Sequence, residues 1–279
     1  MLCLHAGWPR TGTSTLQAAL ARHSSPLAAA GVVYPERWKV ERLESHHGLN
    51  DLLAVSRQSG DAFEDFKRFL VSQGDRDVLL SAEGMTGWAR SSEKREGFLE
   101  LIAAAREVAP TRCVWTLRRF DDTYASMYLL LLALGRDCPP PDEYLAEIRF
   151  QDPLFEGMRQ VEEATDGNVV YVKYDPLGGH NRRLLDAFEV PDAVGVAIRE
   201  ELQRGPDPRS SLSHKEAVAF ANVEALSAAR RHDIGPYVEF FEHAEIEESM
   251  SPGLDPGVID ETDLTQLVAH LERGMNADG

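Results

Sequence analysis

The amino-acid sequence predicts an α/β fold, in which a parallel β-sheet is flanked by helices and followed by a helical C-terminal extension. Short apolar runs alternate with segments of helical periodicity up to about residue 172. Strands that alternate with helices pair in parallel through crossover connections. The 279 residues are enough for one such domain. We therefore predict a single domain with a core over about residues 1–190 and a helical extension over about 191–279.

The N-terminal segment predicts a strand, a loop and a helix in that order. Residues 2–6 form an apolar run that ends at Gly7. A turn rich in Pro, Gly and Thr leads from it into a helical segment at about 14–22. A second short strand is expected at 31–34, where Pro35 closes it. This order is typical of the first unit of a layered α/β sheet.

The later segments continue the alternation. Residues 36–59 are polar and mixed, which predicts a loop with one or two helical turns, and residues 61–73 place apolar side chains at helical spacing. Further strands are expected at 77–81, 112–117 and 168–172, and further helices at 92–108, 121–134, 180–188, 215–231 and 263–273. Strand signals fade beyond Gly178, so the C-terminal part is predicted to be helical.

Charge and hydropathy restrict the classes of function. The net charge of −17 argues against a general nucleic-acid binder, because such a protein needs basic surface to replace the counterions of the polyanion. No apolar run approaches the roughly 20 residues that span a bilayer. Residues 1–7 form a strand-like run without a basic leader or a cleavage site. We therefore expect a cytoplasmic protein without a membrane span.

The three cysteines indicate neither a disulfide framework nor a metal site. Cys3 and Cys113 lie in apolar strand-like runs and are expected in the core, and Cys138 is far from both in the sequence. The sequence has no CxxC or HExxH pattern and no spaced His/Cys cluster. No bound metal is expected.

The most informative segment is the loop from Gly7 to Thr15, with the sequence GWPRTGTST. Between a strand and a helix, the backbone N–H groups of such a loop and the helix N-terminus can hold an anion. Gly7 and Gly12 have the separation of the nucleotide-binding pattern GxxxxGK[ST], and Ser14 takes the hydroxyl position. Thr13, however, stands where that pattern has its lysine.

This loop resembles the 5′-phosphosulfate loop, PKTGTT or PKSGTT, of sulfotransferases that use 3′-phosphoadenosine 5′-phosphosulfate (PAPS). The flanking segments 4–7 and 16–17 are similar to the bacterial branch of that family. The resemblance implies the P-loop-like sulfotransferase fold and PAPS as co-substrate. It implies that the phosphosulfate is bound by Pro9, Arg10, Thr11, Gly12, Thr13, Ser14 and Thr15. Arg10 stands where the family has lysine; it keeps the positive charge but differs from lysine as a donor.

A second motif of the same family follows the strand at 112–117. The family places an Arg at a strand end and a Ser eight residues later, both on the nucleotide 3′-phosphate, and Arg118 and Ser126 have this spacing. At the carboxyl edge of a sheet, both side chains can point at one anion. Arg209 lies in a segment that resembles, more weakly, the basic loop that closes over the nucleotide in related enzymes; an exposed loop is its other interpretation.

Sulfuryl transfer to an alcohol or amine also needs a base, and cations that stabilise the leaving oxygen, a role open to Arg10. In related enzymes a His or Glu lies just beyond the strand that precedes the Arg/Ser strand, a position that Glu83 occupies here. His46 and His47 are the alternatives, because an imidazole has a suitable pKa without tuning. A capping or surface role for Glu83 and a structural role for either histidine also stay open.

Two other functions are compatible with these residues. A P-loop kinase or NTP hydrolase would lack the loop lysine and would have only Glu83 as a magnesium-binding acid after residues 78–82. A catalytically inactive nucleotide-binding module of the same fold is supported by Arg10 alone. For the sulfotransferase, the expected acceptor is a hydroxyl or amine of a small molecule, a lipid or a carbohydrate. Its identity and the oligomeric state are not encoded in these motifs.

Overall fold

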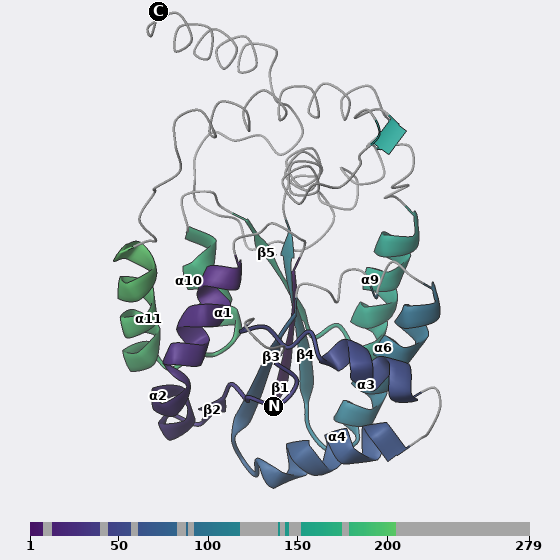
Figure 1. Cartoon of the computed structure of the whole chain (residues 1–279), viewed down its shortest axis with the longest axis horizontal. Helices are drawn as coiled ribbons and strands as arrows, with labels where there is room; N and C mark the ends of the chain where they lie inside the picture. Colours follow the sequence, from purple (N-terminus) through teal and green to yellow (C-terminus); the bar gives the residue numbers. More distant parts are fainter. Residues whose placement is uncertain are drawn as a thin grey trace, which may run out of the picture. The chain divides into compact units, whose positions relative to one another are not determined.

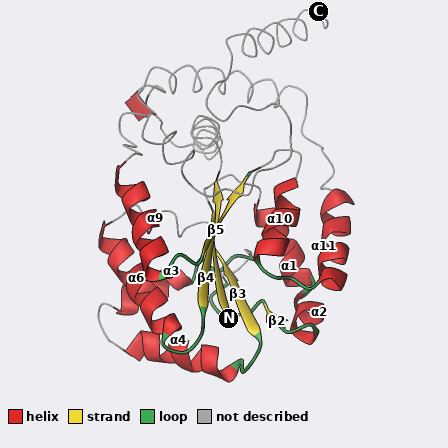
Figure 2. Ribbon diagram, turned by 180° about the vertical axis from the view of Figure 1, so that it is seen from behind, coloured by secondary structure: helices red, strands yellow, loops and turns green. Residues whose placement is uncertain are grey.

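The computed structural model describes residues 1–7, 13–39, 44–56, 61–82, 88, 92–117, 139, 143–144, 152–174 and 179–204. Within these ranges, five strands form a single sheet with helices on both of its faces (Figures 1 and 2). All of these residues except Pro139, Glu143 and Tyr144 belong to one compact unit. The predicted fold class, a parallel sheet flanked by helices, is confirmed.

The strands run in the order β2-β3-β1-β4-β5, and every neighbouring pair is parallel. Their bounds are β1 (Leu2–Gly7), β2 (Val32–Val33), β3 (Asp77–Ser81), β4 (Thr111–Leu117) and β5 (Val169–Lys173). Each bound lies within one residue of the predicted range. The first strand of the chain is therefore the middle strand of the sheet, between β3 and β4.

The helices form two layers. One face of the sheet carries α1 (Thr13–Arg22), α2 (Ser24–Ala29), α10 (Gly179–Ala187) and α11 (Asp192–Arg204) (Figure 1). The other face carries α3 (Leu49–Ser56), α4 (Asp61–Ser72), α6 (Ser92–Arg106) and α9 (Asp152–Ala164) (Figure 2). Parallel strands require such crossover helices, because each chain segment must return to the starting edge before the next strand begins.

The core on the α1 face is built from alternate residues of the central strands. Cys3 of β1 and Leu79 of β3 lie in one buried cluster with Leu16 and Leu20 of α1 and Phe188 after α10. All six residues of β1 are buried, so both faces of this strand are covered. Cys3 and Cys113 are free thiols in the core, as predicted.

Of the two short helices, α2 departs from the predicted pattern and α3 agrees with it. Helix α2 follows α1 almost directly, where no separate helix is expected from the sequence, and Pro26 lies in its first turn, the position at which a helix tolerates proline. Helix α3 gives the predicted helical turns within 36–59. Of the predicted helical extension, 191–279, the described part ends at residue 204 and contains α11.

Among the described residues, no helix is both long enough and apolar enough to cross a membrane.

Candidate functional site

The carboxyl edge of the sheet brings together the ends of the three central strands. β1 ends at Gly7, where the predicted anion loop begins, and β3 ends at Ser81, two residues before Glu83. β4 ends at Leu117, immediately before Arg118. The pairing of His5 with Ser81 and of Gly7 with Thr116 shows that these ends lie side by side. In open parallel sheets, ligands bind outside this edge.

Three of the predicted cofactor-binding residues are described, and they form the first turn of α1. Thr13 is buried, whereas Ser14 and Thr15 are exposed. The first turn of a helix leaves backbone N–H groups without intrahelical acceptors, and α1 has no acidic residue there to occupy them. This end of α1 therefore has the polarity that an anion requires.

The other predicted cofactor-binding residues and Glu83 lie outside the described residues. They are Pro9, Arg10, Thr11 and Gly12 of the loop, Glu83, the pair Arg118 and Ser126, and Arg209. Their roles stay predictions.

His46 is held by main-chain groups at both ring nitrogens. Its Nδ1 accepts the N–H of Ser81 at 3.0 Å, and its Nε2 lies 2.9 Å from the carbonyl oxygen of Pro35, to which it donates. The backbone N–H of His46 also donates to the carbonyl of Ser81 at 2.8 Å. The residue is fully buried, and burial lowers the pKa of His46 to about 4. This geometry ties the loop at 44–49 to the end of β3 and fits a structural role better than that of a base.

His47 differs from its neighbour in its surroundings. It is half-buried, and its Nδ1 lies 2.5 Å from the hydroxyl oxygen of Ser45. Burial lowers the pKa of His47 below its ordinary value. The ring is therefore neutral near pH 7 and can accept a proton. The structure places the two adjacent histidines in different environments, a difference that their sequence positions do not reveal.

A buried polar network beneath the carboxyl edge is a feature that the sequence patterns missed. We define the His5 network as the side chains of His5, Ser81, Thr116 and Gln17. The Nδ1 of His5 lies 2.7 Å from the hydroxyl of Ser81, and the Nε2 lies 2.8 Å from the hydroxyl of Thr116. The amide of Gln17 donates to the same Ser81 hydroxyl at 2.9 Å. The one signal in the sequence is a histidine within an otherwise apolar strand, directly before the loop.

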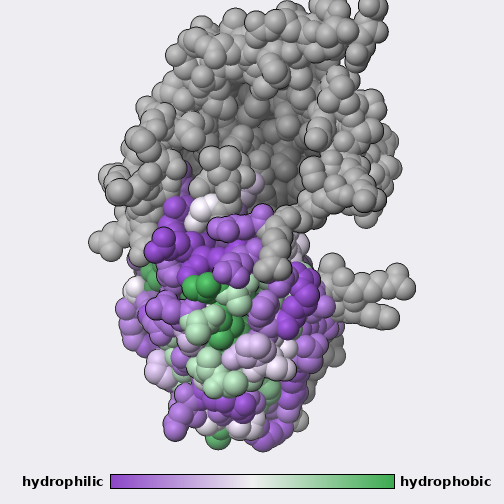
Figure 3. Space-filling view, turned by 90° about the vertical axis from the view of Figure 1, so that its left-hand side faces the viewer, coloured by the Kyte–Doolittle hydropathy of each residue, from purple (hydrophilic) through white to green (hydrophobic). Residues whose placement is uncertain are grey.

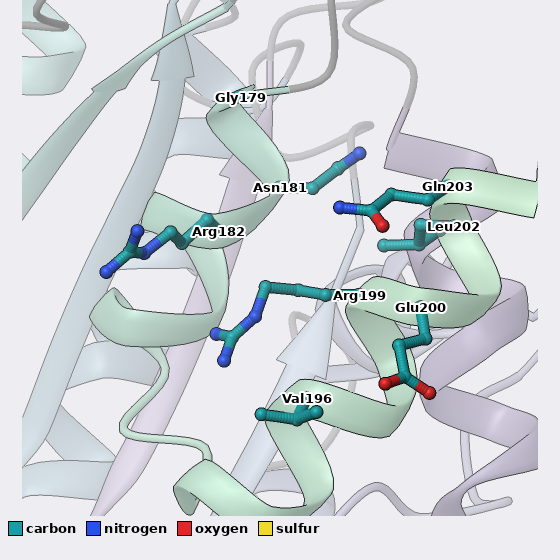
Figure 4. A pocket seen from close by; sticks show the side chains of 8 residues that line it. All are labelled: Gly179, Asn181, Arg182, Val196, Arg199, Glu200, Leu202 and Gln203. Atoms are coloured by element: carbon teal, nitrogen blue, oxygen red, sulfur yellow. The ribbon is translucent and has the colours of Figure 1, made fainter.

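Among the described residues, a pocket lies between α10 and α11 (Figure 4). It has a volume of about 640 Å³ and is lined by Gly179, Asn181, Arg182, Val196, Arg199, Glu200, Leu202 and Gln203. Its two arginines lie 3.9 and 4.0 Å from the carboxylate of Asp186. This side of the molecule is mostly hydrophilic, with a small strip of apolar side chains (Figure 3). No described residue of the predicted site is among the residues that line the pocket.

Comparisons with known proteins give two similar structures. No family model matches the chain, and no curated protein matches it. A crystal structure of a sulfotransferase from Alicyclobacillus acidocaldarius is 16% identical with a TM-score of 0.37, covering 83% of this chain and 96% of that one. A GTPase from Pyrococcus abyssi, in its apo form, is 13% identical with a TM-score of 0.29, covering 68% and 97%. At these values neither likeness assigns an activity, and the case for a function rests on the chain's own residues.

The buried, neutral ring of His46 predicts a loss of stability in acid. The unfolded chain takes up a proton near pH 6.5, whereas the folded protein resists protonation until about pH 4, so unfolding becomes easier as pH falls between these values. From pH 7 to 5, this histidine should account for about 2 kcal/mol of lost stability. Urea unfolding at both pH values should show a smaller loss in His46→Gln than in the wild type. Equal losses in the two proteins would contradict the assignment.

Proposed function

We propose that this protein is a sulfotransferase that transfers a sulfuryl group from PAPS to a hydroxyl or amine of a small molecule, lipid or carbohydrate. The observation that carries the proposal is the juxtaposition at the carboxyl edge of the sheet. The strands β1, β3 and β4, which precede the predicted phosphosulfate loop, Glu83 and Arg118, are adjacent and parallel. Motifs that are far apart in the sequence thus leave the sheet from the same edge.

In this proposal the donor is bound at two ends. The loop amides, the first turn of α1 and Arg10 bind the 5′-phosphosulfate, and Arg118 with Ser126 binds the 3′-phosphate. The exposed side chain of Ser14 is available to donate to a phosphate oxygen, whereas the buried Thr13 contributes through its backbone. Two anchors on one nucleotide fix the direction in which the sulfur atom faces the acceptor.

The transfer step is a displacement at sulfur. The base removes the proton of the acceptor hydroxyl, and the acceptor oxygen forms a bond to sulfur as the bond from sulfur to the bridging phosphate oxygen breaks. The products are the sulfated acceptor, adenosine 3′,5′-bisphosphate and the protonated base. Negative charge develops on the bridging oxygen, where Arg10 and the loop amides stabilise it.

Of the three candidate bases, the contacts in the structure disfavour His46. Both ring nitrogens of His46 bind main-chain groups, so accepting a proton would cost this residue an existing hydrogen bond. His47 is half-buried and neutral, which suits a base. We propose Glu83 as the base because it follows β3, one of the two strands that flank β1, by two residues. His47 is the alternative.

The choice between PAPS and a nucleoside triphosphate gives a direct test of the function. The position that holds lysine in NTP-binding loops is Thr13, which is buried and carries no charge. We expect adenosine 3′,5′-bisphosphate to raise the melting temperature of the protein and ATP with magnesium to leave it nearly unchanged. Differential scanning fluorimetry at matched ligand concentrations measures both. The reverse order would favour a kinase or NTP hydrolase.

The second anchor predicts a loss of affinity in Arg118→Ala. Removing a guanidinium that binds the 3′-phosphate should weaken the binding of adenosine 3′,5′-bisphosphate by about 1.5–3 kcal/mol, the scale of a charge-assisted hydrogen bond. Isothermal titration calorimetry gives the difference. Arg112→Ala is a matched control, because Arg112 lies on β4, the strand that precedes Arg118 in the chain, and pairs with Glu189 at 2.6 Å. Equal affinity in wild type and Arg118→Ala would remove Arg118 from the site.

The base predicts a loss of turnover without a loss of binding in Glu83→Gln. An amide cannot take up the acceptor proton, so turnover should fall by about 100-fold or more, while adenosine 3′,5′-bisphosphate should bind as tightly as to the wild type. The acceptor is first found with labelled PAPS and a panel of alcohols, phenols, sugars and amines. Glu107→Gln, at the surface beside Lys67, is the control. Wild-type turnover in Glu83→Gln would exclude this residue as the base.

A further inference from the structure

The His5 network joins four separate elements: the imidazole connects three strands, and the Ser81 hydroxyl connects them to α1. His5 lies on β1, Ser81 on β3, Thr116 on β4 and Gln17 on α1. All four side chains are buried, with exposed fractions of 0% for His5 and Thr116, 1% for Ser81 and 4% for Gln17. The ring of Phe188 meets the imidazole edge-on at 5.2 Å and covers it from the α10 side. The network is therefore sealed within the α1 face of the sheet.

The three hydrogen bonds of the network are compatible with a single direction of donation. Gln17 donates to the hydroxyl oxygen of Ser81, the Ser81 hydroxyl can donate to Nδ1 of His5, and Nε2–H of His5 can donate to the Thr116 hydroxyl. This direction needs the neutral imidazole with its proton on Nε2. Burial, with a smaller contribution from His180, lowers the pKa of His5 to about 3, so the ring is neutral at ordinary pH.

The position of the network in the chain relates it to the candidate site. His5 precedes Gly7 by two residues, Ser81 precedes Glu83 by two, and Thr116 precedes Arg118 by two. Gln17 lies one turn beyond Thr13, where α1 begins. Along the chain, His5, Ser81 and Thr116 thus each precede a segment to which the proposed function assigns the loop, the base or the 3′-phosphate anchor, and Gln17 follows the loop.

A polar network at this depth has a consequence that apolar packing lacks. Apolar side chains tolerate small shifts of strands, whereas a buried hydroxyl or imidazole that loses its partner carries the full desolvation penalty. The network therefore favours one relative position of the ends of β1, β3 and β4. A displacement of about 1 Å in a binding or catalytic group is enough to impair its function.

From this geometry we propose that His5 is a positioning residue. Its imidazole holds the ends of β1, β3 and β4, and through Ser81 the start of α1, in the spacing that lets one nucleotide reach both anchors. The inference rests on the proposed function, since the two anchors are those assigned to PAPS. It adds a role to a residue that touches neither the nucleotide nor the acceptor.

The test compares a ligand that spans both anchors with one that reaches a single anchor. Adenosine 3′,5′-bisphosphate requires the loop and the Arg118 anchor together, whereas adenosine 5′-phosphate uses the loop only. Misplaced anchors should weaken the binding of adenosine 3′,5′-bisphosphate selectively. Once one phosphate of this ligand is bound, the other gains affinity only if its own anchor lies within reach. A general loss of folded structure would weaken both ligands alike.

The variants separate hydrogen bonding from packing. Thr116→Val keeps the shape of the side chain and removes the hydroxyl, whereas Thr116→Ser keeps the hydroxyl and removes a methyl group. His5→Phe removes both hydrogen bonds of the imidazole. Thr116→Val is the milder change and serves as the test should His5→Phe fail to fold. Cys3→Ala is the matched control, because Cys3 lies on the same face of β1 but only within the apolar cluster.

Calorimetry should show at least ten-fold weaker binding of adenosine 3′,5′-bisphosphate in Thr116→Val and His5→Phe, with adenosine 5′-phosphate changed by less than three-fold. Thr116→Ser and Cys3→Ala should keep both affinities within three-fold. Equal effects on the two ligands, or none, would overturn the role of His5 and leave the proposed function standing. A wild-type protein that binds the bisphosphate no more tightly than the monophosphate would overturn the proposed function and the role derived from it.

Discussion

The burial of β1 in the middle of the sheet is the constraint on which the candidate site depends. This strand has neighbours on both sides and helices on both faces, and all six of its residues are buried, which restrains it by packing and by hydrogen bonds. The loop that follows it starts from a fixed point, as do the segments after β3 and β4. A parallel arrangement is what brings these three starting points to one edge; antiparallel neighbours would place alternate ends on opposite sides.

The surface of the protein is acidic, and several of its arginines are paired with carboxylates. The chain carries a net charge of −17, and several surface arginines pair with carboxylates, among them Arg22 with Glu201, Arg37 with Asp65 and Arg106 with Asp166. Such exposed pairs contribute little to stability, but they neutralise the cations that take part in them. In the proposed function, positive potential for the anionic donor comes from Arg10 and Arg118. An acidic surface around such a cationic site would disfavour long polyanionic acceptors and be compatible with small or neutral ones.

Sequence patterns predicted the sheet well because a buried parallel strand is a continuous apolar run, a signal that does not depend on distant residues. They did not predict the separate helix α2, and they did not distinguish a structural role of His46 from that of a base. Helix α2 is only six residues long and is separated from α1 by His23 alone, so its periodicity merges with that of its neighbour. The role of His46 is decided by main-chain groups of Pro35 and Ser81, which no local pattern relates to it. The loop motif was visible because its residues are consecutive; the His5 network was not, because its members are scattered over four elements.

Polarity along the α1 face of the sheet changes in the direction of the site. Near the amino end, Cys3 and Leu79 pack in an apolar cluster, and one residue pair further the same face presents His5 and Ser81. A protonated imidazole here would add a buried charge behind the proposed anion loop and would need a counter-ion of its own. Burial keeps His5 neutral instead, with its pKa at about 3, so the network contributes oriented dipoles and geometry but no charge. Anion affinity then depends on groups at the sheet edge, and the layer beneath it is free to serve as a rigid support whose protonation state does not change over the physiological pH range.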